Sequence, residues 1–287
     1  RRALKTPTAW ALAVVAFVGL YFLHLPFPLI VFGALVIGFL GGRWAPSQFG
    51  GKQVESNSSP IKGVKASWRS TVRTASVGIA VWGAPILVVG MRLGWDSTLA
   101  QLGWFFSKAA LVTFGGAYAV LPYVGQQAVE NYGWLSATQM VDGLAFAETT
   151  PGPLIMIVQF VGFVAAWQHS SGFSPLVAAT LGAAITTWVT FVPTYLFILL
   201  GAPYVERAHD DARLKAALSA VTAAVVGVIL NLTVWFGIYV IFPASGGVDS
   251  FALGLGLGAF LVMLWTKLDM MLVIVLCGAT GLLWSLI

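Results

Sequence analysis

The chain has 287 residues, of which 59% are hydrophobic and only 9% are charged. Soluble domains carry about 25% charged residues, and the mean hydropathy here is +0.89, so a soluble globular protein is excluded. The net charge of +5 does not indicate a nucleic-acid partner, because the basic residues lie in loops between apolar runs. The composition predicts an all-α polytopic membrane protein, built as a bundle of transmembrane helices.

Apolar runs follow one another along the chain, at roughly 8–25, 28–44, 72–93, 99–114, 117–130, 138–148, 154–168, 175–200, 216–242, 250–266 and 270–286. A helix needs about 20 residues to cross a bilayer, and the runs between 99 and 168 are shorter than that. These short runs form two pairs, the first broken at Phe114–Gly116 and the second at Thr149–Pro153. Paired, Gly/Pro-interrupted segments indicate the binding site of a transporter. Each pair is either one interrupted crossing or a re-entrant hairpin.

The polar segments predict domain organisation and orientation. Segment 45–71 is rich in Gly, Ser, Asn and Lys and is predicted to be a cytoplasmic linker. It separates a terminal hairpin at 1–44, the end of a preceding unit, from a transmembrane unit at 72–287. With the linker in the cytoplasm, 13 of the 15 Lys and Arg residues lie on the cytoplasmic side, and the exceptions are Arg92 and Lys108. This distribution agrees with the positive-inside rule.

The first break lies in the sequence FGGAYAVLP, residues 114–122. Gly115 and Gly116 allow the backbone to leave the helix, and a new helix is expected to start at Ala117 with its amide donors and positive dipole end facing the break. In lipid, unpaired backbone groups are tolerated only inside protein or beside a wet cavity. The alternative is a simple kink or a small-residue packing site.

The second break lies in ETTPGP, residues 148–153. Thr150 suits an N-cap and Pro151 a first helical position, so the helix over 154–168 is expected to begin here. Helix N-termini bind oxyanions, and two of them facing one point would suit a tetrahedral dianion. Pro151 and Pro153 lack an N–H, which leaves Gly152, Leu154 and the threonine hydroxyls as donors. The alternative is a helix boundary at the membrane surface.

Two charged residues lie close to the breaks. Lys108 is a cation inside an apolar run, and such residues are functional candidates by default; two helical turns separate it from Gly115. The alternative is a lysine that snorkels to the surface. Glu148 directly precedes the second break, where a protonatable acid would serve proton coupling; pairing with Lys108 is the alternative. Asp142 is a weaker candidate of the same kind.

Other polar residues favour packing roles. Thr187, Thr190 and Thr194 recur on one helix, where threonines usually bond their own backbone carbonyls. Gln159 and Asn231 either line a pathway or join helices. The sequence shows no metal-ligand spacing and no nucleophile–His–acid set, so no catalytic residue, metal or cofactor is predicted. Cys277 is expected to be apolar filler.

The two break motifs, about 30 residues apart, together with the stretches TTWVTFVPTYLFILLGAPYVER and AVVGVILNL, resemble the second repeat of the chromate ion transporter (CHR) family. Long members of that family carry two homologous halves, each with such breaks and with opposite topologies. The resemblance implies half of an inverted-repeat transporter, preceded by the tail of the first repeat. It also implies chromate efflux and chromate resistance, and an antiporter in the bacterial cytoplasmic membrane. A sulfate or other oxyanion exchanger and a non-transporting membrane subunit are the alternatives.

The predicted partners are an oxyanion (chromate or sulfate), the lipid bilayer, and the first repeat or a partner chain, with a homodimer left open. Glu148 is the proton-coupling candidate. The predicted substrate-binding residues are Lys108, Phe114, Gly115, Gly116, Tyr118, Thr149, Thr150, Gly152 and Gln159.

Overall fold

The computed structural model describes residues 4, 6–44, 68–113, 117–149, 154–170, 172–209, 211–242, 246–266 and 268–286. Every regular element in these ranges is helical, which confirms the all-α prediction. The elements are α1 (Pro7–Tyr21), α2 (Phe27–Trp44), α4 (Trp68–Leu93), α5 (Thr98–Val112), α6 (Ala117–Gln126), the π-helix η1 (Gln127–Asn131), α7 (Ala137–Thr149), the 3-10 turn η2 (Leu154–Met156), α8 (Ile157–Gln168), α9 (Pro175–His209), α10 (Ala212–Ile241), α11 (Ser250–Trp265) and α12 (Met270–Ser285).

Within the described ranges, four helices are long and apolar enough to cross a membrane: α2, α4, α9 and α10. Many of their large apolar side chains face outward, and α11 buries none of its residues. In water such a surface would be unstable, whereas in a bilayer it contacts lipid. The described chain is therefore a helical membrane bundle.

The first broken pair, α5 and α6, is a re-entrant hairpin. Phe105 on α5 and Tyr123 on α6 lie on opposite sides of the break, and their ring centroids are 5.4 Å apart. This pairing requires the chain to reverse at the break, because an interrupted straight helix would carry the two rings far apart. Phe105 also packs against Tyr132 and Trp134, and this aromatic cluster fixes the hairpin in the core.

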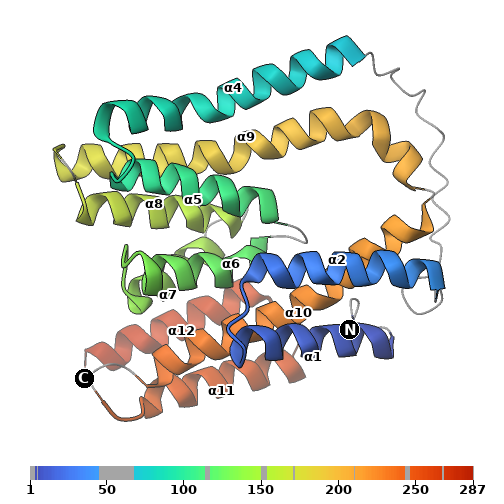
Figure 1. Cartoon of the computed structure of the whole chain (residues 1–287). Helices are drawn as coiled ribbons and strands as arrows, with labels where there is room; N and C mark the ends of the chain where they lie inside the picture. Colours follow the sequence, from blue (N-terminus) through green and yellow to red (C-terminus); the bar gives the residue numbers. More distant parts are fainter. Residues whose placement is uncertain are drawn as a thin grey trace.

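The second broken pair, α7 and α8, reverses in the same way. Gly143 on α7 lies directly against the ring of Phe160 on α8, and the Phe146 and Phe160 ring centroids are 6.3 Å apart. The structure thus resolves the alternative that the sequence left open: both pairs are hairpins. Figure 1 shows that they enter from the same end of the molecule.

The last turns of α5 and the start of α8 lie beside the middle of the long helices. Trp82, near the centre of α4, donates its indole N–H to Ser107 on α5 at 3.2 Å. Gly162 on α8 contacts Gly182 and Thr186 on α9, so the start of α8 lies beside the middle of α9. Backbone approach this close requires glycine on both helices, as in other membrane helix pairs.

The first two-thirds of α10 pack against the α1–α2 hairpin, and its last third packs against α6. Gly38 on α2 contacts Ala217, and Gly227 contacts the backbone of Ala13 on α1. The turn between α1 and α2 then meets α6, where Phe27 stacks on Tyr123 with centroids 6.1 Å apart. Figure 1 shows this turn midway between the two ends of the bundle. The α1–α2 hairpin enters from the end opposite to that of the α5–α6 hairpin.

The ends of the bundle differ in charge. The end of α2, the start of α4 and the α9–α10 connection lie together at one end in Figure 1. This end carries Arg43, Arg69, Arg73, Arg213 and Lys215. The arrangement agrees with the parity expected from the positive-inside rule.

Candidate functional site

The two breaks can be placed by the helices that flank them. Phe114, Gly115, Gly116, Thr150 and Gly152 lie outside the described residues. α6 begins at Ala117, as expected, and the second returning helix begins with η2 at Leu154. η2 contacts both α6 and α7, so the start of the second returning helix lies against the helix that follows the first break.

Three further predicted residues lie next to the breaks. Tyr118 belongs to the first turn of α6, and Glu148 and Thr149 end α7. Their side chains are outside the described set, and the backbone places all three close to the hairpin tips.

Lys108 lies four residues before the end of α5 and points away from the described core. Its ammonium sits 5.8 Å from the ring centroid of Trp104, one turn earlier, and the Trp104 side chain is 60% exposed. α5 ends at Val112, so the helical register that would place Lys108 and Gly115 on one face does not extend to Gly115. Lys108 thus belongs to an outer face of this bundle near the hairpin tip.

The remaining sequence candidates fall on α8 and α9. Gln159 is half-buried on α8. Thr187, Thr190 and Thr194 donate to the carbonyls of Ala183, Thr186 and Thr190 at 2.8, 2.7 and 3.2 Å. Each is a hydrogen bond to the preceding turn of the same helix, which confirms the packing interpretation of these threonines.

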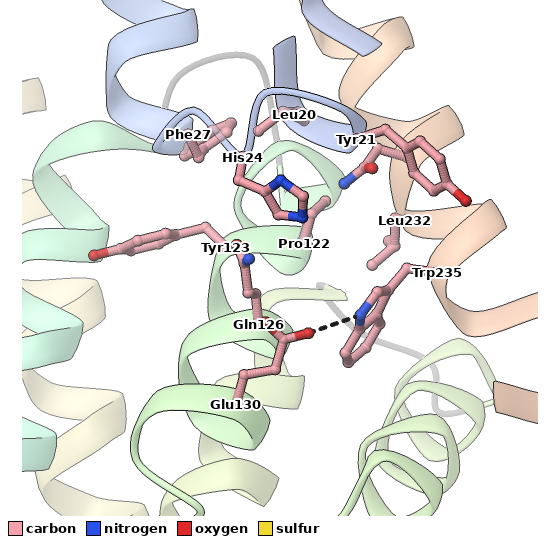
Figure 2. Close-up of a pocket in the computed structure, with 11 residues that line it drawn as sticks. Leu20, Tyr21, His24, Phe27, Pro122, Tyr123, Gln126, Glu130, Leu232 and Trp235 are labelled. Atoms are coloured by element: carbon pink, nitrogen blue, oxygen red, sulfur yellow. Dashed lines mark hydrogen bonds between the residues drawn. The ribbon is translucent and has the colours of Figure 1, made fainter. Parts of the chain in front are cut away.

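A polar cavity that sequence reasoning missed lies where the α1–α2 turn meets α6, η1 and α10. Its volume is about 380 Å³, and its lining combines hydrogen-bonding side chains with an apolar rim. The lining residues are Leu20, Tyr21, His24, Phe27, Pro122, Tyr123, Gln126, Glu130, Asn231, Leu232 and Trp235. Figure 2 shows His24 and Glu130 at opposite ends of the cavity with Gln126 between them.

The polar groups of this cavity come from parts of the chain far apart in sequence. The indole N–H of Trp235 donates to the Glu130 carboxylate at 3.1 Å across 105 residues. In sequence, Glu130 belongs to an interfacial loop and His24 to a short turn, and no local spacing connects them. Only the folded arrangement reveals the cavity. The described residues contain no cluster of His, Cys, Asp and Glu suited to a metal ion.

Long crossings combined with two re-entrant hairpins that contact each other define a class of protein. This is the architecture of multi-pass membrane transporters, in which irregular backbone at membrane depth lines a substrate pathway.

Comparison with known proteins identifies the family. The model of the chromate transporter family matches residues 100–282, so the chain belongs to that family. It is 36% identical to a chromate transport protein of Cupriavidus metallidurans over 136 residues, which cover 47% of this chain and 31% of that protein. It is 34% identical to a chromate transport protein of Pseudomonas aeruginosa over 211 residues, covering 72% of this chain and 47% of that protein.

A shorter relative extends the comparison. The uncharacterized transporter YwrA of Bacillus subtilis is 29% identical over 129 residues, covering 45% of this chain and 66% of that protein. The chain spans about a third to a half of the chromate transport proteins that it matches. No solved structure matches it. The names of the relatives support a transporter rather than an enzyme.

Proposed function

We propose that the chain is part of a secondary active transporter that exports an oxyanion, chromate in the first place, across the bacterial cytoplasmic membrane. The observation that carries this proposal is the pair of re-entrant hairpins, in which the start of the second returning helix, η2, contacts the first returning helix, α6. Two helix N-termini at one place offer amide donors and positive dipole ends to an anion. Chromate is proposed as the substrate because two relatives are named chromate transport proteins.

The proposed binding site is the space between the starts of α6 and η2. Backbone amides after the breaks and the hydroxyls of Thr149 and Thr150 would donate to the oxyanion, and Gln159 would line the pathway nearby. Each helix end contributes about 0.3–1 kcal/mol to a nearby anion, and each charge-assisted hydrogen bond about 1.5–3 kcal/mol. Loss of one such donor should therefore weaken binding about tenfold to a hundredfold, since about 1.4 kcal/mol corresponds to a factor of ten.

Lys108 is proposed to supply the full positive charge of the site. Its outward position next to Trp104 fits a site that is completed by a second unit, either the preceding repeat or a partner chain. In a bilayer, a lysine on a lipid-facing surface close to mid-depth would be costly. Cover by a second unit removes that cost and places the ammonium between the two units.

The test is oxyanion binding by the purified protein, measured calorimetrically with chromate and with sulfate. Lys108→Met should weaken binding at least about tenfold, and Lys108→Arg less, because arginine keeps the charge with a different donor geometry. Thr150→Val should weaken it moderately. Lys267→Met, a loop base, is the matched control and should bind like the parent.

Parent-like affinity in both Lys108→Met and Thr150→Val would contradict the proposed site. Both anions are measured because the two dianions are close in shape and charge. Stronger binding of sulfate than of chromate would favour a sulfate exchanger over a chromate exporter.

Glu148 is proposed to couple transport to protons, because it ends α7 directly before the second break. Glu148→Gln should bind chromate normally and lose the acceleration of transport by a pH gradient across vesicles. An unchanged response to the gradient would leave Glu148 as a structural partner of the site.

A further inference from the structure

The cavity between the α1–α2 turn, α6, η1 and α10 is unusually polar for its place in the molecule. His24, Gln126, Glu130 and Asn231 line it, although the helices around it are predominantly apolar. Polar groups at membrane depth are costly unless they contact water or one another. A cavity of about 380 Å³ has room for several water molecules, since each occupies about 30 Å³ in the liquid.

Irregular backbone borders the cavity at both ends. His24 has φ +49°, a left-handed conformation that is uncommon for residues other than glycine. Glu130 belongs to the π-helix η1, in which the Tyr132 N–H bonds to the Gln127 carbonyl at 2.9 Å. Such backbone conformations concentrate at functional sites, and here both present a titratable side chain to one cavity.

The Glu130 carboxylate is held at the open end of the cavity. The Glu130 side chain is exposed, and the Trp235 indole N–H donates to it at 3.1 Å. Trp235 is itself fixed by edge contacts with Phe236 and Tyr239, with ring centroids 5.0 and 4.9 Å apart. The hydrogen bond therefore aims the carboxylate at the cavity mouth.

We propose that this cavity is a water-filled proton pathway between Glu130 at one end and His24, in the turn between α1 and α2, at the other; both side chains are exposed in this chain. A proton enters from water at Glu130 and crosses by way of Gln126, Asn231 and intervening water. It then reaches His24 in the turn that meets α6. The proton returns to water by the reverse route, so no other reactant is needed. The pathway links the aqueous end that bears η1 to the middle of the molecule, where the tip of the α5–α6 hairpin lies.

The groups that face the pathway come from every element around it. The α1–α2 turn presents His24 and η1 presents Glu130, whereas the phenol oxygens of Tyr21 on α1 and Tyr123 on α6 point away from the middle of the cavity in Figure 2. Within the cavity lining, α10 contributes Asn231, Leu232 and Trp235 and no titratable group. Of these groups, the Glu130 carboxylate and the His24 imidazole take up and release the proton in the proposed pathway.

The proton pathway is tested by two measurements, and the first, which is chromate transport, rests on the proposed function. Chromate transport by the full protein in liposomes is measured while the pH on the η1 side is varied between 6 and 8. The parent should show at least about a threefold difference in rate across this range, because the proton concentration at the entrance of the pathway changes about a hundredfold. In Glu130→Gln and His24→Asn the ratio should fall close to one, with chromate affinity unchanged. Asparagine suits His24 because it tolerates a left-handed backbone.

Matched controls are Asp96→Asn, an acid in the turn between α4 and α5, and His169→Asn, in the loop after α8. Both should keep the pH response of the parent. Trp235→Phe, which removes the donor to Glu130 and keeps an aromatic ring, should shift the pH of half-maximal rate without abolishing the response.

The second readout tests hydration and needs no transport. In a Cys277→Ala background, Gln126→Cys should react with a small charged thiol reagent, whereas Val124→Cys, fully buried on the same helix, should not. An unreactive Gln126→Cys would overturn the proton pathway, and so would a parent-like pH response in both Glu130→Gln and His24→Asn. Absence of chromate transport in the parent would instead contradict the proposed function, and the hydration result would still decide the cavity.

Discussion

Polar side chains on the helices of this protein separate into groups that bond to their own helix and groups that lie on an outer face. Thr186 and Thr190 are buried on α9 and donate to the carbonyls one turn earlier, at 2.7 Å each. Lys108, by contrast, contacts an exposed tryptophan on the outer face of α5. A polar residue at membrane depth is therefore not sufficient to indicate a functional site. A side chain that bonds to its own helix has a structural role.

Thr190→Val provides a test of this separation. The hydroxyl of Thr190 is satisfied by its own helix, so its removal should leave chromate affinity within about twofold. It should also lower the unfolding free energy by only about 0.6 kcal/mol, a typical value for hydrogen bonds inside membrane proteins. Binding calorimetry and thermal unfolding in detergent measure the two effects. A tenfold loss of affinity would return Thr190 to the binding site.

Among the secondary-structure elements, the packing of α8 against α9 depends on two glycines. A Cβ added at Gly162 would meet the Thr186 side chain and the Gly182 carbonyl. Gly162→Ala should therefore force the two helices apart and destabilise the protein by about 1–3 kcal/mol, as overpacking does elsewhere. Thermal unfolding checks the expectation. Gly83→Ala, on α4 with open space around it, is the matched control and should unfold like the parent.

The elements also show which features the sequence could predict. The starts of the helices at Ala117 and Leu154 agree with the predicted ranges, because glycine and proline act locally, whereas the expected cap at Thr150 and Pro151 lies outside the described residues. The reversal at each break did not follow, because it depends on contacts such as Phe105 with Tyr123 and Gly143 with Phe160. The polar cavity was missed for the same reason: His24, Glu130 and Trp235 have no common local pattern. The helix starts that flank the predicted oxyanion site are confirmed, whereas the ligand roles of its residues stay predictions.

The whole molecule has two chemically distinct ends, and this sets its orientation. We expect the end that bears the linker and the α9–α10 connection to be cytoplasmic, and the end at which both re-entrant hairpins enter to be outside. In a Cys277→Ala background, cysteines at Ser58 and Ala212 should resist an impermeant thiol reagent applied to intact cells, and a cysteine at Ser174, between α8 and α9, should react. Labelling of Ser58→Cys or Ala212→Cys from outside would reverse the assigned orientation.

The half-depth reach of the two hairpins also has an electrical consequence. Because α5 ends and η2 begins midway along the long helices, water that reached these helix ends from the side at which the hairpins enter would leave a thinner insulating layer there than the bilayer itself. The membrane voltage then falls over a short distance, and the local field is correspondingly stronger. Moving one elementary charge through 100 mV involves about 2.3 kcal/mol, so about twice that acts on a dianion as it passes the tips. The passage of the substrate past the tips is thus the step at which membrane voltage should set the rate.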